Sequence, residues 1–367
     1  MTFRSVLAAP LAVLALLGCS STSDSSASAP EQDITAMHTV PTVITLPNGG
    51  VGTGGIGMDD LAYAADIDRI VVPAGRTGDL DLVDPVTLKV TQISGFSVEK
   101  QFHGSHDFGA TSVTEVGGHL YVGDRTTNTM QVVNPKRAAV VGTPIKFAAS
   151  PDYLRAVESL HELWVSEPDK QQIEIFKLSS DGTPSHAEVI AIDGDGPESL
   201  IIDRTRGRAY TNLFSNVSLS IDLKTRKIVD RYTNACAKNG TDPNDRGSRG
   251  LALDEARGFL MVACSEGLTS VIDVKVPTGK QVGQAKIPGG LLDIVAYDPV
   301  LQHLYATTDT KLVIAALGAD GALTPLGTAA IPDQARSVVV DGKGFVYVGD
   351  QKGGGLLRFQ DPFAAGH

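Results

Sequence analysis

The tetrapeptide Tyr121-Val122-Gly123-Asp124 recurs unchanged as Tyr347-Val348-Gly349-Asp350. Both copies follow a short apolar strand and a turn that contains glycine, so they indicate an internal repeat. The pattern is an apolar strand, a small polar turn, a second apolar strand, a polar loop and a third strand. Its first turn begins, at spacings of 43 to 51 residues, at Ala64, Glu115, Glu158, Asp203, Asp254, Asp298 and Asp341. Seven such units of four short strands predict an all-β fold, a seven-bladed β-propeller.

The last repeat is one strand short. It offers strands at 337–340, 345–348 and 356–359, whereas the apolar stretch Val40–Leu46 has no repeat of its own. We therefore expect this N-terminal strand to pair with the last blade, which closes the ring and removes both exposed edges. Two stacked β domains are the alternative, but no linker interrupts the series.

The repeat consensus resembles a known family. Strands ending in Tyr-Val are followed by a loop, a Val-Ile-Asp strand and a turn with a lysine, as at Asp222–Lys227. This resembles the YVTN-repeat, or YncE-like, seven-bladed propellers over nearly all of the chain after residue 40. The repeats are degenerate: Tyr210-Thr211-Asn212 lacks the valine, and Trp164 replaces the tyrosine. The resemblance implies a fold but no activity, because propellers host binding proteins, lactonases and redox enzymes.

The N-terminus resembles a bacterial lipoprotein signal. Arg4 precedes an apolar run from Val6 to Leu17, too short to span a bilayer as a helix, and the run ends in Leu16-Leu17-Gly18-Cys19. In bacterial lipoproteins the chain is cut before this cysteine, which is then acylated; an ordinary secretory signal is the alternative. The expected organisation is a signal peptide at 1–18, a lipidated Cys19 with a Ser/Ala-rich tether at 19–37, the propeller at 38–363 and a tail at 364–367.

The net charge of the chain limits the partners that it can bind. The formal net charge is −11, and removal of residues 1–18 with Arg4 makes it −12, with no Lys/Arg cluster anywhere. Such a chain is a poor nucleic-acid binder, so no nucleic-acid partner is expected.

The lipoprotein resemblance implies that acylated Cys19 binds the lipid bilayer of the cell envelope. Ser20 favours the outer membrane in a cell with two membranes; otherwise we expect the outer face of the cytoplasmic membrane. We expect a monomer.

Cys236 and Cys264 remain as an even pair in an oxidising compartment, which allows a disulfide. Cys264 ends the second strand of the fifth repeat, and Cys236 follows the fourth strand of the repeat before it. In a propeller both of these strand ends lie on one face. We therefore predict a Cys236–Cys264 disulfide, with two separate buried thiols as the alternative.

A propeller's binding face carries the loops between blades and those between second and third strands. Residues just before each first strand point into the central funnel. Five positions before each first turn stand Asp59, Ala110, Tyr153, Glu198, Arg249, Asp293 and Arg336. Arginines bind carboxylate or phosphate, and acids bind cations or hydroxyls, so this ring is our candidate ligand site. We expect Glu198, Arg249, Asp293 and Arg336 to converge around the channel mouth, with the two arginines exposed. Asp60, Asp107, Asp152 and Arg246 are expected near its rim. Mutual pairing of these charges is the alternative.

His103, His106 and Asp107 form the only close histidine pair with a carboxylate, in the loop between the first two repeats. Such residues could bind a divalent metal or act as acid and base. A loop-bracing role is the simpler interpretation. Asp193-Gly194-Asp195-Gly196 lacks the further carboxylates of a calcium loop and indicates a turn. We therefore predict no cofactor, with a divalent metal at His103, His106 and Asp107 as the alternative.

The sequence contains no Gly-x-Ser-x-Gly elbow, Walker loop, dinucleotide fingerprint or His-Glu-x-x-His motif. We therefore predict a non-catalytic binding module, tethered in the envelope, for an envelope protein or a small polar ligand. The alternative is a lactonase-like hydrolase of the gluconolactonase type. Its metal ligands would be Asp59, Glu198 and Asp293, although Arg249 and Arg336 nearby oppose a divalent cation.

Overall fold

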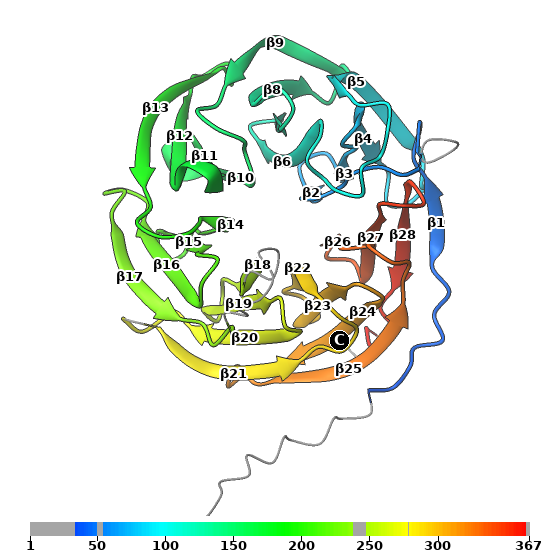
Figure 1. The fold of residues 1–367 in the computed structure, drawn as a ribbon, viewed down its shortest axis with the longest axis vertical. Helices are drawn as coiled ribbons and strands as arrows, with labels where there is room; N and C mark the ends of the chain where they lie inside the picture. The colour runs from blue at the N-terminus through cyan, green and yellow to red at the C-terminus, as the bar shows by residue number, and fades with distance from the viewer. Residues whose placement is uncertain (1–33, 50–53, 238–246, 278, 365–367) are drawn as a thin grey trace, which may run out of the picture. The chain divides into compact units, whose positions relative to one another are not determined.

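The computed structural model describes residues 34–49, 54–237, 247–277 and 279–364. In the unit that starts at Ile34, seven four-stranded antiparallel sheets follow one another around a central channel (Figure 1). The first strand of each repeat is innermost in its sheet, and neighbouring inner strands contact each other around the ring, from β2 through to β26. The predicted all-β, seven-bladed propeller is confirmed.

The first three blades have these bounds: β2 (Ala62–Ala64), β3 (Arg69–Pro73), β4 (Thr77–Val83) and β5 (Val90–Val98); β6 (Ala110–Val116), β7 (His119–Asp124), β8 (Thr129–Asn134) and β9 (Ala139–Lys146); β10 (Leu154–Val157), β11 (Glu162–Glu167), β12 (Gln172–Leu178) and β13 (Pro184–Ala191). Two short 3-10 turns, η1 (Glu158–Leu160) and η2 (Pro168–Lys170), flank β11.

The next three blades are β14 (Glu198–Asp203), β15 (Arg208–Asn212), β16 (Val217–Asp222) and β17 (Ile228–Thr233); β18 (Ser248–Asp254), β19 (Phe259–Cys264), β20 (Leu268–Asp273) and β21 (Lys280–Lys286); β22 (Leu292–Asp298), β23 (His303–Thr308), β24 (Lys311–Leu317) and β25 (Leu323–Ala330). The seventh blade combines β26 (Ser337–Val340), β27 (Phe345–Asp350) and β28 (Gly355–Gln360) with β1 (Thr42–Thr45).

The ring closes through the N-terminal strand, as predicted. β1 pairs antiparallel with β28, with Thr42 opposite Arg358 and Thr45 opposite Gly355. Before β1, the Met37 N–H donates to the Thr328 carbonyl of the sixth blade at 2.6 Å. The seventh sheet therefore combines a strand from each end of the described chain, and β1 covers the outer edge of β28.

Each pair of neighbouring blades shares one hydrophobic cluster. Ile44 and Tyr347 of the seventh blade, for example, pack with Ile70 and Val72 of the first. A blade cannot bury both of its faces alone, so the stacked neighbours supply the core. The repeated motif belongs to this core, since its aromatic residues are at most 1% exposed at Tyr121, Trp164, Tyr210, Tyr305 and Tyr347. The buried phenols keep a partner: the Tyr305 hydroxyl donates to Asp361 at 2.6 Å.

The predicted disulfide is also confirmed. Cys236 follows β17 and Cys264 ends β19, and the two are bonded with a Cα–Cα distance of 5.2 Å. Both residues are buried, so the bond links the fourth and fifth blades within their shared cluster.

Several predictions concern residues outside the described part of the chain. These are the signal peptide at 1–18, lipidation at Cys19, most of the tether at 19–37, Arg246, and residues 365–367 of the tail. Within the described ranges, no helix is long and apolar enough to span a bilayer.

Candidate functional site

A cavity of about 430 Å³ lies at the mouth of the channel. Its walls are the loops between blades and the loops between second and third strands, which is the face predicted from the repeat. We call it the mouth cavity; its charged lining residues are His106, Asp107, Arg125, Asp152, Asp169, Glu198, Arg249 and Arg336. Three of the seven predicted ring residues, Glu198, Arg249 and Arg336, are therefore brought together here.

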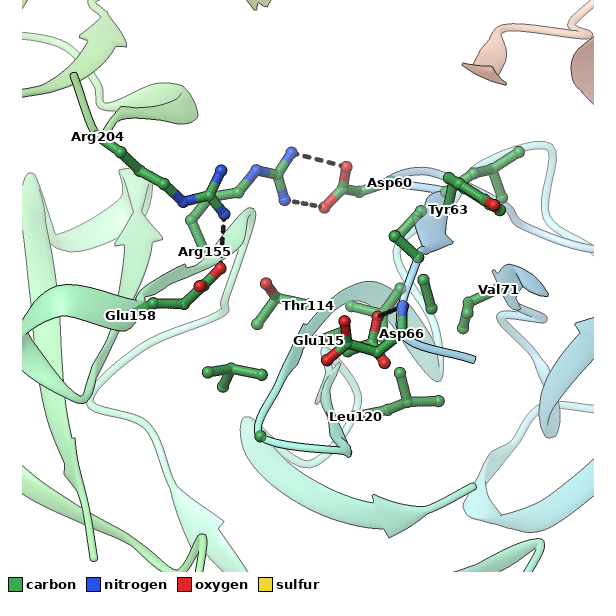
Figure 2. A pocket seen from close by; sticks show the side chains of 17 residues that line it. Asp60, Tyr63, Asp66, Val71, Thr114, Glu115, Leu120, Arg155, Glu158 and Arg204 are labelled. Carbon is green, nitrogen blue, oxygen red and sulfur yellow. Dashed lines mark hydrogen bonds and ion pairs between the residues drawn. The ribbon is translucent and has the colours of Figure 1, made fainter. Parts of the chain in front are cut away.

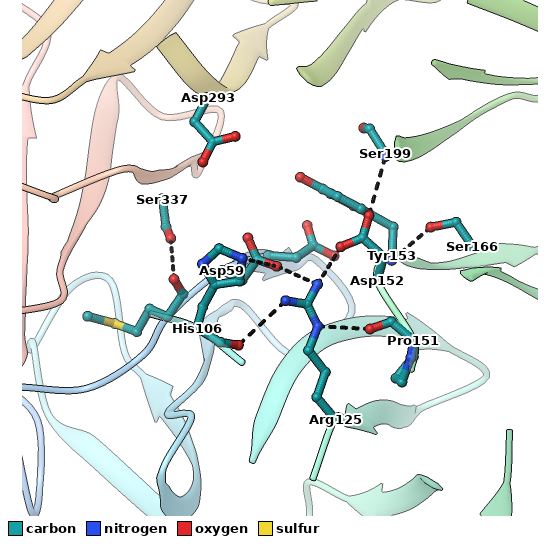
Figure 3. A network of polar contacts seen from close by, with 12 residues as sticks. Asp59, His106, Arg125, Pro151, Asp152, Tyr153, Ser166, Ser199, Asp293 and Ser337 are labelled. Carbon is teal, nitrogen blue, oxygen red and sulfur yellow. Dashed lines mark hydrogen bonds and ion pairs between the residues drawn. The ribbon is translucent and has the colours of Figure 1, made fainter. Parts of the chain in front are cut away.

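Arg125 is the centre of the mouth's polar network (Figure 3). Its Nη2 donates to Asp59 at 3.0 Å and also to Asp152, while Nε donates to the Pro151 carbonyl at 2.9 Å. Burial opposes the charge of Arg125, yet the two carboxylates raise its pKa above the usual value. Arg125 thus joins the connections that precede the first, second and third blades, because His106 O also lies 3.5 Å from Nη1.

Arg336 forms a second, looser group at the mouth. Its guanidinium lies 3.5 Å from Asp293 and 3.4 Å from His106 Nδ1. His106 Nε2 is 3.9 Å from Asp59, so the imidazole connects the two groups. Burial lowers the pKa of His106, despite the opposing charge of Asp59, so the ring is neutral near pH 7.

Two acids of the mouth have raised pKa values. Burial raises the pKa of Asp152 to about 7, although Arg125 opposes this shift. Burial and the charge of Asp152 also raise the pKa of Glu198 well above its usual value, with Arg249 opposing. Two neighbouring buried carboxyls disfavour joint ionisation, so each acid makes the other harder to ionise.

The remaining ring residues lie deeper or contact the mouth indirectly. Asp59 and Asp293 are 6% and 8% exposed and bind Arg125 and Arg336, and Tyr153 is 6% exposed in the channel below. The expectation that Arg249 and Arg336 are exposed is wrong, since both are half-buried. For Asp59 and Asp293 the alternative of mutual pairing holds, since each binds an arginine.

Asp60 does not reach the rim. It lies in the channel beside a cavity of about 200 Å³, where it binds Arg155 of β10. A further cavity of about 330 Å³ opens at the other end of the channel, among the hairpins between first and second strands (Figure 2). Its charged lining includes Asp66, Glu115, Glu158 and Arg204.

The histidine pair is split between two surroundings. His103 packs on Phe108 with ring centroids 5.2 Å apart and lies 4.0 Å from Glu99, whereas His106 faces Asp59 and Arg336. Asp107 lines the mouth cavity. In the described ranges, no group of three His, Cys, Asp or Glu side chains is placed to hold a metal ion.

Sequence reasoning missed Arg125 and Arg155. Arg125 directly follows the Tyr121–Asp124 motif and opens the loop between second and third strands, so the loop rule applied to this repeat would have found it. Arg155 had no such signal, since it lies within a first strand and its partner Asp60 is 95 residues away.

Comparison with known proteins gives the fold alone. No family model and no curated protein matches the chain. Among solved structures, that of U3-55K is 11% identical and covers 87% of this chain and 98% of its own, with a TM-score of 0.68. A chain of the mitotic checkpoint complex (12%, 95% and 98%, 0.68) and the RRP9 WD40 repeats (10%, 89% and 98%, 0.69) are similarly related. The chain is thus a β-propeller protein, and at such identities nothing further transfers from these structures.

Proposed function

We propose that this chain is a non-catalytic binding module, a YncE-like propeller held in a bacterial cell envelope by acylated Cys19. Its mouth cavity takes a polar group of an envelope protein or a small polar ligand. The cavity carries the proposal: it is about 430 Å³ in volume and gathers charged side chains from several blades around one opening. A concave site with convergent polar groups is the usual form of a ligand site.

The network beneath the cavity supports a rigid site. Arg125 binds Asp59, Asp152 and the Pro151 carbonyl, so three loops of the mouth share one anchor. A preformed site loses little entropy when a ligand binds, which favours affinity. No specific observation favours the lactonase alternative, and two of its three metal-ligand candidates, Asp59 and Asp293, bind arginines.

A filled-cavity variant tests this proposal. Ser150 lines the mouth, and Ser150→Trp would occupy the cavity, whereas Asp320→Trp places the same side chain in the exposed turn between β24 and β25. Polar metabolites and short peptides are screened for a rise in the melting temperature of the full chain. We expect hits that act on wild type and Asp320→Trp but not on Ser150→Trp.

Two results would count against the binding module. Hits that Ser150→Trp leaves intact would move the site elsewhere. Stoichiometric metal in elemental analysis of the purified chain, together with hydrolysis of gluconolactone, would support the lactonase alternative.

A further inference from the structure

The described part of the mouth carries more acid than base. Arg125, Arg249 and Arg336 are its three guanidinium groups. The carboxyl groups that line the cavity or bind these arginines number six: Asp59, Asp107, Asp152, Asp169, Glu198 and Asp293. His106 adds no charge near pH 7, because burial lowers its pKa. Ionised carboxyls therefore outnumber cations at this opening.

The arginines are already engaged by these acids. Arg125 binds two carboxylates, Asp59 and Asp152, and Arg336 faces Asp293 and His106. The charge of Arg249 acts on Glu198, whose pKa it lowers. An anionic ligand would have to break such contacts and leave buried carboxylates unpaired, which is costly.

Glu198 lines the cavity without a direct partner, as Asp107 and Asp169 also do within the described ranges. Its carboxylate lines the cavity, and within the described ranges it takes no hydrogen bond and forms no ion pair. Asp152 lies close by, since its Oδ2 is 3.5 Å from the backbone N of Ser199, the residue after Glu198. The charges of Asp152, Asp293 and Asp59 raise the pKa of Glu198, and that of Arg249 lowers it. A cation placed beside Glu198 would gain a charge-assisted hydrogen bond without displacing any contact.

We propose that the mouth cavity selects a cationic group, an ammonium or guanidinium, and that Glu198 with Asp152 binds it. The inference rests on the proposed function and specifies its ligand class. A lysine or arginine side chain of a partner and a free small amine share this chemistry. A side chain of either kind fits within a cavity of about 430 Å³.

The site would release a proton when the cation binds. Burial raises the pKa of Asp152 to about 7 and that of Glu198 above its usual value, so an incoming cation that favours the ionised forms displaces the proton that Asp152 holds in part near pH 7. The affinity for a cation therefore rises with pH between about 6 and 8, by up to about tenfold per pH unit for one displaced proton. Binding of an anion to the arginines would show the opposite trend.

Matched peptides test the selection. Calorimetry on the full chain compares acetylated, amidated Gly-Lys-Gly, Gly-Arg-Gly, Gly-Gln-Gly and Gly-Glu-Gly, with 1,5-diaminopentane as the free amine. We expect at least tenfold tighter binding of a cationic probe than of the glutamate peptide, and a further rise from pH 6 to 8. Preference for the peptides over the diamine identifies a partner's side chain as the source, and the reverse identifies a free amine.

Two variants give the control. Glu198→Gln should abolish the cationic preference and the pH trend, whereas Glu255→Gln, the same change in the hairpin at the other end of the fifth blade, should leave both unchanged. Tighter binding of Gly-Glu-Gly than of the cationic peptides would overturn the inference, although it would still support a ligand site in the mouth cavity. Cation binding that Glu198→Gln leaves unaffected would also overturn the inference. If no probe binds at millimolar concentration, the inference is also wrong. The screen with Ser150→Trp then tests the proposed function separately.

Discussion

Arg155 binds Asp60 across the central channel through two hydrogen bonds. Its Nη1 and Nη2 donate to the two carboxylate oxygens at 2.5 and 2.9 Å (Figure 2). Arg155 lies in β10 of the third blade, and Asp60 precedes β2 of the first, so the bond passes over the second blade. The guanidinium also stacks on the Tyr153 ring at 4.9 Å. The pair therefore links non-adjacent blades, and both residues line the cavity of about 330 Å³.

Removal of one member of this pair should be costly. Arg155→Met leaves the Asp60 carboxylate buried without its cation, and we expect a loss of about 3 kcal/mol at pH 7 in urea unfolding. Burial already raises the pKa of Asp60 against the effect of Arg155, so protonation should relieve much of the loss near pH 4. Arg155→Met with Asp60→Asn should recover most of the stability. A single variant as stable as wild type at pH 7 would contradict a structural role for the pair.

Asp81 should make the protein less stable as pH rises. It is fully buried between the first and seventh blades, both of its carboxylate oxygens lack a hydrogen bond, and burial with the charge of Asp79 raises its pKa to about 8. The folded state then binds a proton that the unfolded state releases, so stability falls between about pH 4 and pH 8. Asp81→Asn should remove that dependence, measured as urea midpoints at pH 5 and 8.

The control for Asp81 is Asp320→Asn, which changes an exposed carboxyl in the turn before β25. We expect its pH profile to follow that of wild type. An Asp81→Asn profile parallel to wild type would show that Asp81 does not hold a proton in the folded protein.

The disulfide should account for a measurable share of stability. In the Cys19→Ala chain only Cys236 and Cys264 remain, and thiol titration of the denatured, unreduced protein should find no free thiol. The bond joins residues 28 positions apart, and a loop of that size stabilises the folded state by about 3 kcal/mol in the loop-entropy model. Urea unfolding with and without reductant checks this loss, and Cys236→Ser should lose as much without reductant. Two free thiols per chain would refute the bond.

The repeat made most of the fold predictable. The strands, the turns and the motif recur at regular spacing, and each copy of the repeat corresponds to one blade. The number of blades and the closing strand could therefore be predicted from local patterns. The Cys236–Cys264 pair followed from the blade geometry by the same logic. These inferences depend only on residues within one repeat or in two neighbouring repeats.

The site was less predictable because its contacts cross the ring. The position five residues before each first turn correctly located Glu198, Arg249 and Arg336 at the cavity. Asp59 and Asp293, chosen in the same way, are instead buried against Arg125 and Arg336 of neighbouring blades. No single repeat encodes such contacts between blades. The partner of Asp60 and the isolation of Asp81 likewise depend on side chains from distant blades.

The closing strand can be tested at two adjacent residues. Ile44 is 4% exposed and packs against the first blade, whereas Val43, its neighbour on β1, is 65% exposed. Ile44→Asp buries a charge between the seventh and first blades and should lower the free energy of unfolding by about 3 kcal/mol or more. Val43→Asp should change the same free energy by about 0.5 kcal/mol or less. Deletion of 40–46 should destabilise the chain further, because it exposes the edge of β28. Equal effects of the two substitutions would mean that β1 does not close the ring in solution.

The last prediction concerns the tether. If Cys19 is acylated, two or three chains each contribute about 0.8 kcal/mol per buried CH₂, which is enough for stable membrane association. Cys19→Ala should therefore move the protein from the membrane fraction to the soluble fraction, and metabolic labelling with a clickable fatty acid should mark wild type only. Cys236→Ala serves as the matched control, because it removes a cysteine within the propeller and should stay labelled and membrane-bound. A Cys19→Ala chain that remains in the membrane fraction after high-salt washing would show that the association depends on something other than a lipid on Cys19.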